Sequence, residues 1–427
     1  MHWRGLKTNM FKGPIARATI RTSFVLGLRL IVQAGTLLLV ARMLGPADYG
    51  AFAAIAALAV LMGTFATFGT HLVLLAEVSK DREQRASVLR YAVPTTLFSG
   101  SMLFVLYLAA GEFWLANAKV PLQVMACIGL TETLLLPLYL LPATEELALE
   151  KTARSQLLVI FPLALRMAVA GIVMLLVPVQ PLVLFAWLYL ATALLALVCM
   201  KVYKHDAWLQ PKHWKLPNRV QLKHSIGYAT LSLTAAGPSE LDKMLAVKLL
   251  PLGASGIYAA ASRVMGAATL PVVALLLSAM PRLFRDSQNN SVRSQHLMRW
   301  ILVTVLAYGI FLATALWFAA PLFDWLFGSQ YTGIGQALQW LCLAVPALAL
   351  RFSVSTMLLT IDKPWLRAGL EVLGMLTLVV LASVVFSGWG VKGMALALAG
   401  SEWVMVGVGI LVVYRNRKNK SPTVYEL

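Results

Sequence analysis

The chain has 427 residues, of which 59% are hydrophobic and only 13% are charged. Soluble domains carry about 25% charged residues, so this composition excludes a mostly solvated surface and indicates a polytopic membrane protein. The net charge of +18 does not indicate nucleic-acid binding, because the basic residues are dispersed between apolar runs instead of gathering on a soluble domain.

Apolar runs long enough to cross a bilayer follow one another along the whole chain. A span needs about 20 mostly apolar residues. A basic tail precedes the first run, which is too long for a cleaved signal peptide and is therefore predicted to be retained. The sequence predicts an all-α polytopic membrane protein with about twelve spans, at residues 20–41, 48–70, 89–111, 121–144, 155–178, 181–201, 225–249, 254–280, 298–320, 335–360, 365–387 and 391–414.

The loops on the two predicted sides differ in their basic residues. Most of the 36 Lys and Arg residues lie in the two tails and in the loops that follow the even-numbered spans. The opposite loops contain only Arg42, Lys119, Lys248 and Lys392. Because loops rich in Lys and Arg stay on the cytoplasmic side, both termini are predicted to be cytoplasmic.

A polar, basic segment at 204–224 divides the spans into two sets of six. We therefore expect an N-terminal six-helix lobe at 1–203, a cytoplasmic linker at 204–224, and a C-terminal lobe at 225–427 that ends in a basic cytoplasmic tail.

The two halves repeat a short motif. Gly50-Ala51-Phe52-Ala53-Ala54 aligns with Gly256-Ile257-Tyr258-Ala259-Ala260, Arg42 with Lys248 at the same spacing, and Glu150-Lys151 with Asp362-Lys363 at a similar one. Since six spans are an even number, both halves have the same orientation in the membrane. Such a parallel repeat is typical of alternating-access transporters, with a central cleft between the two bundles.

Charged residues inside the spans are the candidate functional residues. An ionised group at the bilayer centre costs at least about 2.5–3.5 kcal/mol, so each needs a partner or a watery cavity. The basic residues are Arg29, Arg166, Lys243, Arg263 and Arg351, and the acidic ones are Glu132, Glu240, Asp242, Glu371 and Glu402.

The five basic residues have two interpretations. They can line a cationic cleft that binds an anionic headgroup, where the planar fork of Arg suits phosphate and Lys acts as a point charge. Alternatively they form internal ion pairs, for example Arg166 with Glu132, or Lys243 with Glu240 at i,i+3.

A second candidate site lies in the seventh span. Gly237-Pro238 is expected to bend the helix just before Glu240 and Asp242. The two carboxylates could couple transport to a cation or a proton, or the segment could be a structural bend that Lys243 neutralises.

The chain has no sequence motif for a catalytic centre, a phosphate-binding loop or a metal site, and no large extramembrane domain. Cys127, Cys199 and Cys342 lie far apart inside apolar runs and are expected to pack as small hydrophobic side chains. We therefore predict no catalytic residue, no cofactor and no metal, and we do not expect an ATP-driven pump.

Three segments resemble the polysaccharide transporter branch of the multidrug/oligosaccharidyl-lipid/polysaccharide exporter superfamily, which includes bacterial O-antigen flippases. They are ARMLGPADYGAFAAIAAL (41–58), FATFGTHLVLLAEVSKD (65–81) and LDKMLAVKLLPLGASGIYAAASRV (241–264). In the last segment Asp242-Lys243 stands where the family more often has Asp-Arg. The resemblance extends over residues 17 to 414.

The resemblance implies two six-helix lobes arranged in a V around a cationic cavity. It also implies a flippase that moves an undecaprenyl-diphosphate-linked oligosaccharide, an O-antigen or exopolysaccharide repeat unit, from the inner to the outer leaflet of the bacterial inner membrane. Arg29, Arg166, Arg263 and Arg351 would hold the diphosphate. The implied partners are the lipid-linked oligosaccharide, membrane lipids, a polysaccharide polymerase and a chain-length regulator.

Three other functions compete with the flippase. A multidrug or cation antiporter of the same superfamily needs an acidic cleft, whereas basic residues here rival the acidic ones within the spans. A membrane polymerase or ligase of polysaccharide assembly needs a large outer loop, and the predicted outer loops are short. An assembly scaffold would leave the charges within the spans unexplained.

Overall fold

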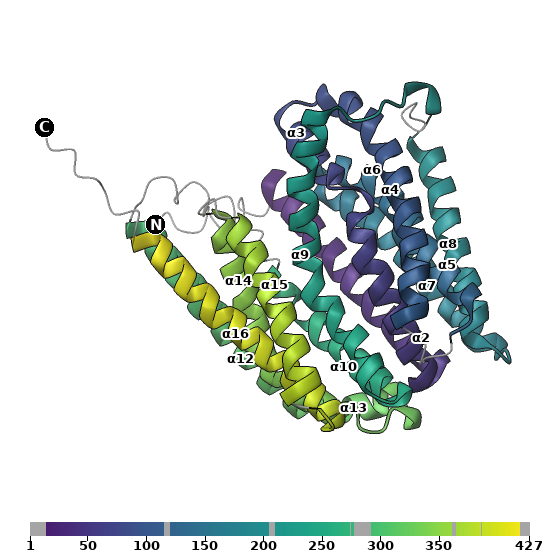
Figure 1. The fold of residues 1–427 in the computed structure, drawn as a ribbon, viewed down its shortest axis with the longest axis vertical. Coiled ribbons are helices and arrows are strands. Elements are labelled where there is room, and N and C mark those ends of the chain that lie inside the picture. The colour runs from purple at the N-terminus through teal and green to yellow at the C-terminus, as the bar shows by residue number, and fades with distance from the viewer. Residues whose placement is uncertain are drawn as a thin grey trace, which may run out of the picture. The chain divides into compact units, whose positions relative to one another are not determined.

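The computed structural model describes residues 14–114, 120–204, 210–273, 275–276, 292–360, 364–385 and 387–418 (Figure 1). Within these residues the chain is helical and contains no strand, which confirms the predicted fold class. Ten helices in this part of the chain are long and apolar enough to cross a membrane.

The count of twelve spans stays a prediction. One of the ten long helices covers Phe24–Ala66 and contains a break at Gly45, where the sequence predicts a turn between two spans. The helix α9 (Arg219–Leu249) has the place and length of the predicted seventh span but is not among the ten.

Contacts divide the chain into two compact units. The first unit comprises Met1–Leu44 and Leu58–Leu233, and the second comprises Gly45–Ala57 and Thr234–Leu427. The predicted lobe boundaries follow the loops, whereas the division by contacts runs inside α9 and assigns a short piece of the first half to the second unit. The boundaries of the lobes stay a prediction.

The first unit is a helical bundle in which α4, α5, α6, α7 and α8 lie side by side (Figure 1). Its elements are α2 (Pro14–Ala66, apart from Gly45–Ala57), α3 (Thr70–Lys80), α4 (Gln84–Trp114), α5 (Leu122–Leu130), η2 (Thr131–Leu135), α6 (Leu136–Ala148), α7 (Thr152–Leu176), α8 (Pro181–Lys204), η4 (Pro211–His213) and the first half of α9.

The second unit contains the rest of α9 and the helices that follow. In it α12 packs against α14, α16 packs against both α14 and α15, and α10 packs against α13. Its elements are α10 (Leu252–Ala268), α12 (Val292–Phe327), η5 (Ser329–Tyr331), α13 (Ile334–Leu341), η6 (Cys342–Ala344), α14 (Val345–Thr360), α15 (Pro364–Val380), η7 (Leu381–Val385) and α16 (Gly390–Lys418).

The fourth span of each half is interrupted near its middle. In the first half a π-helical turn, η2, separates α5 from α6, and in the second half a 3₁₀ turn, η6, separates α13 from α14. Such interruptions change the direction of side chains relative to a continuous α-helix. The Asp362-Lys363 copy of the second repeated pair lies outside the described residues.

The segment after α8 packs on the first unit. Trp214 joins an apolar cluster built from α3, α4 and α6, and the Lys215 N–H donates to the Arg90 carbonyl at 3.0 Å. Part of the predicted linker is therefore fixed to the helices that precede it.

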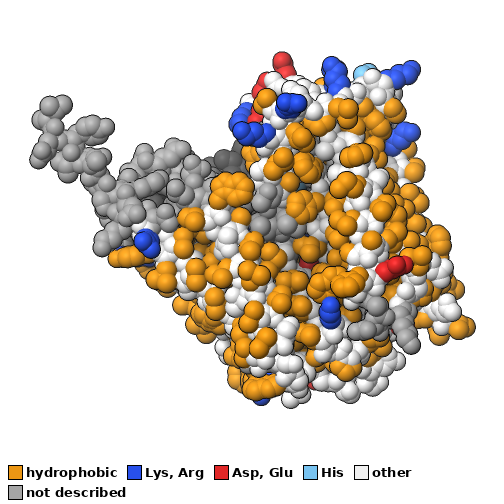
Figure 2. Space-filling view, viewed as in Figure 1, with side chains coloured by type: hydrophobic (Ala, Val, Ile, Leu, Met, Phe, Trp, Pro, Cys, Tyr) orange, Lys and Arg blue, Asp and Glu red, His pale blue; other side chains and the backbone are white. Residues whose placement is uncertain are grey.

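Hydrophobic and basic side chains separate on the surface of the first unit. Hydrophobic side chains cover the long sides of the helices, and Lys and Arg side chains gather at the end that carries α3 (Figure 2). This distribution is the one expected for helices that cross a membrane and carry their basic residues on one side.

Candidate functional site: buried charges of the spans

In the first unit, Arg166 of α7 lies between a carboxylate and an aromatic ring. Its Nη2 is 3.0 Å from Oε1 of Glu132, and its guanidinium carbon is 3.9 Å from the centre of the Tyr189 ring. Tyr189 of α8 donates its hydroxyl proton to the same oxygen of Glu132. The π-helical turn η2 carries Glu132, so this turn brings the carboxylate to α7 and α8.

Arg166 retains donor capacity in this arrangement. Its side chain is 12% exposed, and its buried Nε has no hydrogen-bond partner. Buried polar groups are nearly always hydrogen-bonded, so the unpaired Nε–H of Arg166 is an unusual feature of this site.

Arg29 lies on the neighbouring helix α2. Its Nη1 donates to Oε1 of Gln156 at 2.8 Å, so the partner is an uncharged amide. This bond satisfies a donor without neutralising the charge of the guanidinium. Gln156 and Arg166 are both on α7, about 15 Å apart along the helix axis at 1.5 Å per residue.

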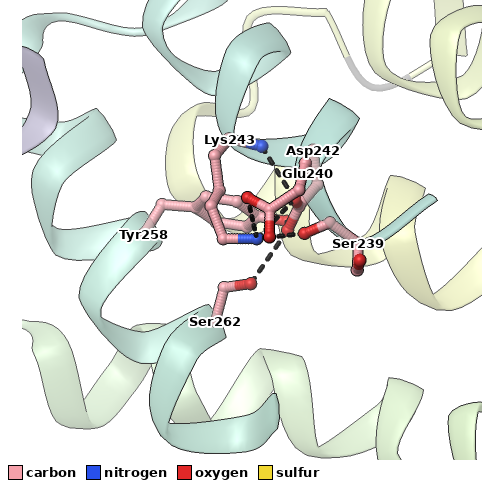
Figure 3. A network of polar contacts seen from close by, with 6 residues as sticks. All are labelled: Ser239, Glu240, Asp242, Lys243, Tyr258 and Ser262. Atoms are coloured by element: carbon pink, nitrogen blue, oxygen red, sulfur yellow. Dashed lines mark hydrogen bonds and ion pairs between the residues drawn. The ribbon is translucent and has the colours of Figure 1, made fainter. Parts of the chain in front are cut away.

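In the second unit, three charged residues of α9 form a compact cluster (Figure 3). Lys243 Nζ is 3.1 Å from Asp242 Oδ1 and 3.7 Å from Glu240 Oε2, and it also donates to the Ser239 carbonyl. Asp242 Oδ2 accepts hydrogen bonds from two residues of α10, Ser262 at 2.8 Å and Tyr258 at 3.1 Å.

The cluster has a structural consequence. Asp242 is 2% exposed and accepts hydrogen bonds at both oxygens, so it ties α9 to α10. The helix α9 runs as one continuous helix through Pro238. Lys243 neutralises this carboxylate locally, as the structural interpretation of the segment requires.

A second buried ion group joins three helices of the second unit. Arg351 of α14 donates from Nε to Glu402 of α16 at 2.7 Å and from Nη1 to Glu371 of α15 at 2.9 Å. Ser355 donates to the other oxygen of Glu371 at 2.9 Å. All three charged side chains are at most 2% exposed, so the group is fully enclosed in the unit.

Arg263 is half-buried on α10, next to Ser262, and interacts with neighbouring groups. The five basic residues are therefore distributed over both units: Arg29 and Arg166 in the first, and Lys243, Arg263 and Arg351 in the second. Both ion pairs named in the sequence analysis as the alternative to a cationic cleft, Arg166 with Glu132 and Lys243 with Glu240, are present.

The sequence profile of one family matches residues 15–287, more than half of the chain; its description is "Polysaccharide biosynthesis protein". The chain belongs to the polysaccharide biosynthesis protein family. This agrees with the family resemblance of the three quoted segments. No curated protein matches the chain by sequence.

Solved structures place this polysaccharide biosynthesis protein in a transporter fold. An inward-facing multidrug resistance MATE family transporter of the MOP superfamily superposes with a TM-score of 0.75 at 15% identity, covering 95% of this chain and all of the other. An outward-facing structure of such a transporter gives a TM-score of 0.65 at 14% identity, covering 94% and 96%.

A third similar structure is a MOP superfamily transporter from Pyrococcus furiosus, with a TM-score of 0.66 at 14% identity, covering 95% and 96%. It is described as having a binding pocket of reversed polarity that suggests a different function. At these identities the likeness establishes the fold. The protein is thus a multi-pass membrane protein with a transporter fold.

Sequence reasoning did not identify the uncharged members of these sites. Gln156 and Tyr189 belong to apolar-looking helices and carry no local signal. Tyr258 and Ser262 are four residues apart, so the sequence predicts that they share a helix face. Their hydrogen bonds to Asp242, which lies on another helix, could not be predicted from it. Within the described residues no group of three or more His, Cys, Asp or Glu could hold a metal ion.

Proposed function

We propose that this protein is a flippase that moves a polyprenyl-diphosphate-linked oligosaccharide from the inner to the outer leaflet of the bacterial inner membrane. The observation that carries the proposal is that Arg29 and Arg166, two half-buried arginines, have guanidinium groups whose charge or donors are only partly compensated. An anionic headgroup supplies the missing acceptors and charge.

The acidic residues of the spans are less suited to bind a substrate. Each of the five that the sequence analysis singled out has a basic partner within 4 Å: Glu132 has Arg166, Glu240 and Asp242 have Lys243, and Glu371 and Glu402 have Arg351. A cationic substrate would have to compete with these internal cations. An anionic substrate meets no such competitor at Arg29, whose bonded partner is a neutral amide.

The mechanism follows from the cost of moving charge through hydrocarbon. A diphosphate cannot cross the bilayer core unaided, and guanidinium groups replace the water that it loses. The prenyl tail stays in the lipid throughout. Alternating exposure of the site to the two sides, by movement of the two halves, then carries the headgroup and its sugars across.

The test is movement of a labelled polyprenyl-diphosphate oligosaccharide between leaflets of liposomes that contain the purified protein. We expect Arg29→Gln and Arg166→Gln each to slow this movement by at least about ten-fold, equivalent to about 1.4 kcal/mol. Arg42→Gln is the matched control, because Arg42 is an exposed arginine in a predicted outer loop. Equal rates in all four proteins would contradict the proposal.

A multidrug antiporter is the second candidate, because the similar solved structures include multidrug resistance transporters. Cells that express the protein should then extrude ethidium against a gradient. The same assay separates the two candidates, since a flippase specific for an anionic headgroup gives no such efflux.

Membership of the polysaccharide biosynthesis family also suggests which proteins act with this one. We propose that both termini are cytoplasmic and that a polysaccharide polymerase and a chain-length regulator act on the flipped product. Surface polysaccharide should disappear from cells in which Arg166→Ala or Arg263→Ala replaces the native protein, while the protein itself stays in the membrane.

A further inference from the structure

The two copies of the repeated motif touch each other, backbone against backbone. A methyl group placed on Gly256 of α10 would lie 1.8 Å from the Pro46 carbonyl oxygen of α2. A methyl group on Gly50 would lie 2.5 Å from the Leu252 carbonyl oxygen and 2.8 Å from the Gly256 nitrogen. Only glycine permits this approach at both positions. The contact lies inside the second unit, which includes Gly45–Ala57.

Small residues make the closest approaches in this contact. Ser255 is fully buried beside Gly50, and its hydroxyl donates to the Leu252 carbonyl of its own helix at 2.8 Å. Tyr49, at 1% exposure, meets the edge of Tyr331 with ring centres 6.5 Å apart. Small residues allow two helix backbones to approach each other this closely.

A backbone break borders the contact on its N-terminal side. Gly45 has φ +71°, a left-handed conformation that interrupts α2, and Pro46 follows it. The chain passes from the first compact unit to the second between Leu44 and Gly45. The segment that makes the contact is therefore joined to the preceding span by a residue with unusual backbone freedom.

We propose that the contact of Pro46 and Gly50 with Leu252, Ser255 and Gly256 is the outer gate of the transporter. The inference rests on the proposed flippase and deepens it by naming the element that closes one side of its pathway. The gate is closed when the two repeated corners touch, and it opens when they part with Gly45 as the hinge. In the topology predicted from the Lys and Arg residues of the loops, both corners lie on the outer side.

Ser255 is the probe for opening, because a cysteine there is nearly isosteric and is buried only while the corners touch. A background without native cysteines carries Ser255→Cys, and a charged, membrane-impermeant thiol reagent is added from outside. Ala47→Cys, exposed at the same corner, gives the rate for a free thiol. A third protein retains Cys342 as its single cysteine. This residue is 3% exposed and lies elsewhere in the second unit, so its labelling rate measures global unfolding.

Two glycines of α10 supply matched variants. Gly256→Ala pushes a methyl group into the Pro46 carbonyl, whereas a methyl group on Gly253, one turn away, meets nothing within 4 Å. We expect Ser255→Cys to react at least ten-fold more slowly than Ala47→Cys. Gly256→Ala should accelerate that reaction at least ten-fold, and Gly253→Ala should leave it unchanged. Gly50→Ala forces the same separation from the other helix and should act like Gly256→Ala.

Three results would overturn the gate. The first is that the labelling rate of Ser255→Cys equals that of Cys342 in every variant, since the two corners would then never separate. The second is acceleration by Gly253→Ala equal to that by Gly256→Ala. The third is that, without any glycine substitution, Ser255→Cys and Ala47→Cys are labelled at equal rates, since the two corners would then never touch.

Leaflet transport gives a second readout. Reagent attached at Ser255→Cys should prop the corners apart and abolish movement of the labelled lipid, whereas reagent at Ala47→Cys should not. Retained transport after full modification of Ser255→Cys counts against the gate. If the unmodified protein moves no lipid at all, the flippase proposal fails, and the labelling rates still decide whether the corners part.

Discussion

Arg166 and Arg351 are both arginines within the spans, but their guanidinium groups have different surroundings. Arg351 has a carboxylate on each of two neighbouring helices and is fully enclosed by them. Arg166 shares a single carboxylate with Tyr189 and keeps an unsatisfied Nε. The two guanidinium groups therefore differ in their number of acceptors, and the proposed anion site uses Arg166, the one with fewer.

Removing Arg351 should destabilise the second unit strongly. Arg351→Met leaves Glu371 and Glu402 as two uncompensated buried carboxylates, and breaking such a buried pair costs about 3–5 kcal/mol. The measurement is the free energy of unfolding of the purified protein in mixed detergent micelles.

The triple variant R351M/E371Q/E402Q is the control for this prediction. It replaces the whole ion group by neutral side chains, and we expect it to recover most of the loss, because neutral replacement of a complete buried ion pair is often tolerated. A single Arg351→Met variant as stable as the native protein would show that the group contributes nothing to packing.

At the scale of the element, the interruptions of the helices determine where charges and close contacts fall. The turn η2 presents Glu132 to Arg166, and its backbone carbonyls lie against glycines of two other helices. A methyl group on Gly63 of α2 would lie 2.3 Å from the Glu132 carbonyl oxygen, and one on Gly100 of α4 would lie 2.7 Å from that of Thr133. These contacts hold the turn in place.

Alanine at these glycines should therefore disturb the turn. We expect Gly63→Ala to lower the free energy of unfolding by about 1–3 kcal/mol through overpacking. Gly171→Ala in α7 is the matched control, because nothing lies within 4 Å of the added methyl group. It should stabilise its helix by about 0.5–1 kcal/mol. Equal effects of the two substitutions, measured by the same unfolding titration, would contradict the close packing of η2.

At the scale of the whole molecule, the two contact units do not coincide with the two halves of the sequence. Gly45–Ala57 belongs to the second unit although it precedes most of the first, and the first half of α9 belongs to the first unit. The first half of α9 joins the first unit because Ser225 and Ala229 of this helix closely approach Gly69. The second and seventh predicted spans thus each contribute to both units.

The orientation of the whole chain can be tested by thiol accessibility. In a background without native cysteines, Ala47→Cys should react with an impermeant reagent added to intact cells, since it lies in a predicted outer turn. Glu83→Cys, exposed between α3 and α4, should react only after the membrane is permeabilised. Reaction of both from the same side would overturn the predicted topology.

Much of the protein could be read from the sequence because the relevant signals are local. Each predicted span is a contiguous apolar run, and the Gly45-Pro46 break is visible as a dipeptide. The side of each loop, inferred from its Lys and Arg content, stays a prediction. The all-α membrane fold and the family are confirmed. The ten charged residues of the spans were also identifiable, since charge in an apolar run needs no further context.

By itself the sequence determined that this is a helical membrane protein of the polysaccharide biosynthesis family and which charges its spans contain. Only the tertiary structure decided which of those charges are neutralised, that Gln156 and Tyr189 accompany Arg29 and Arg166, and that the two repeated corners meet. The reason is physical. Arg351 and Glu402 are 51 residues apart, and such partners are selected by the packing of separate helices, which no local pattern of residues encodes.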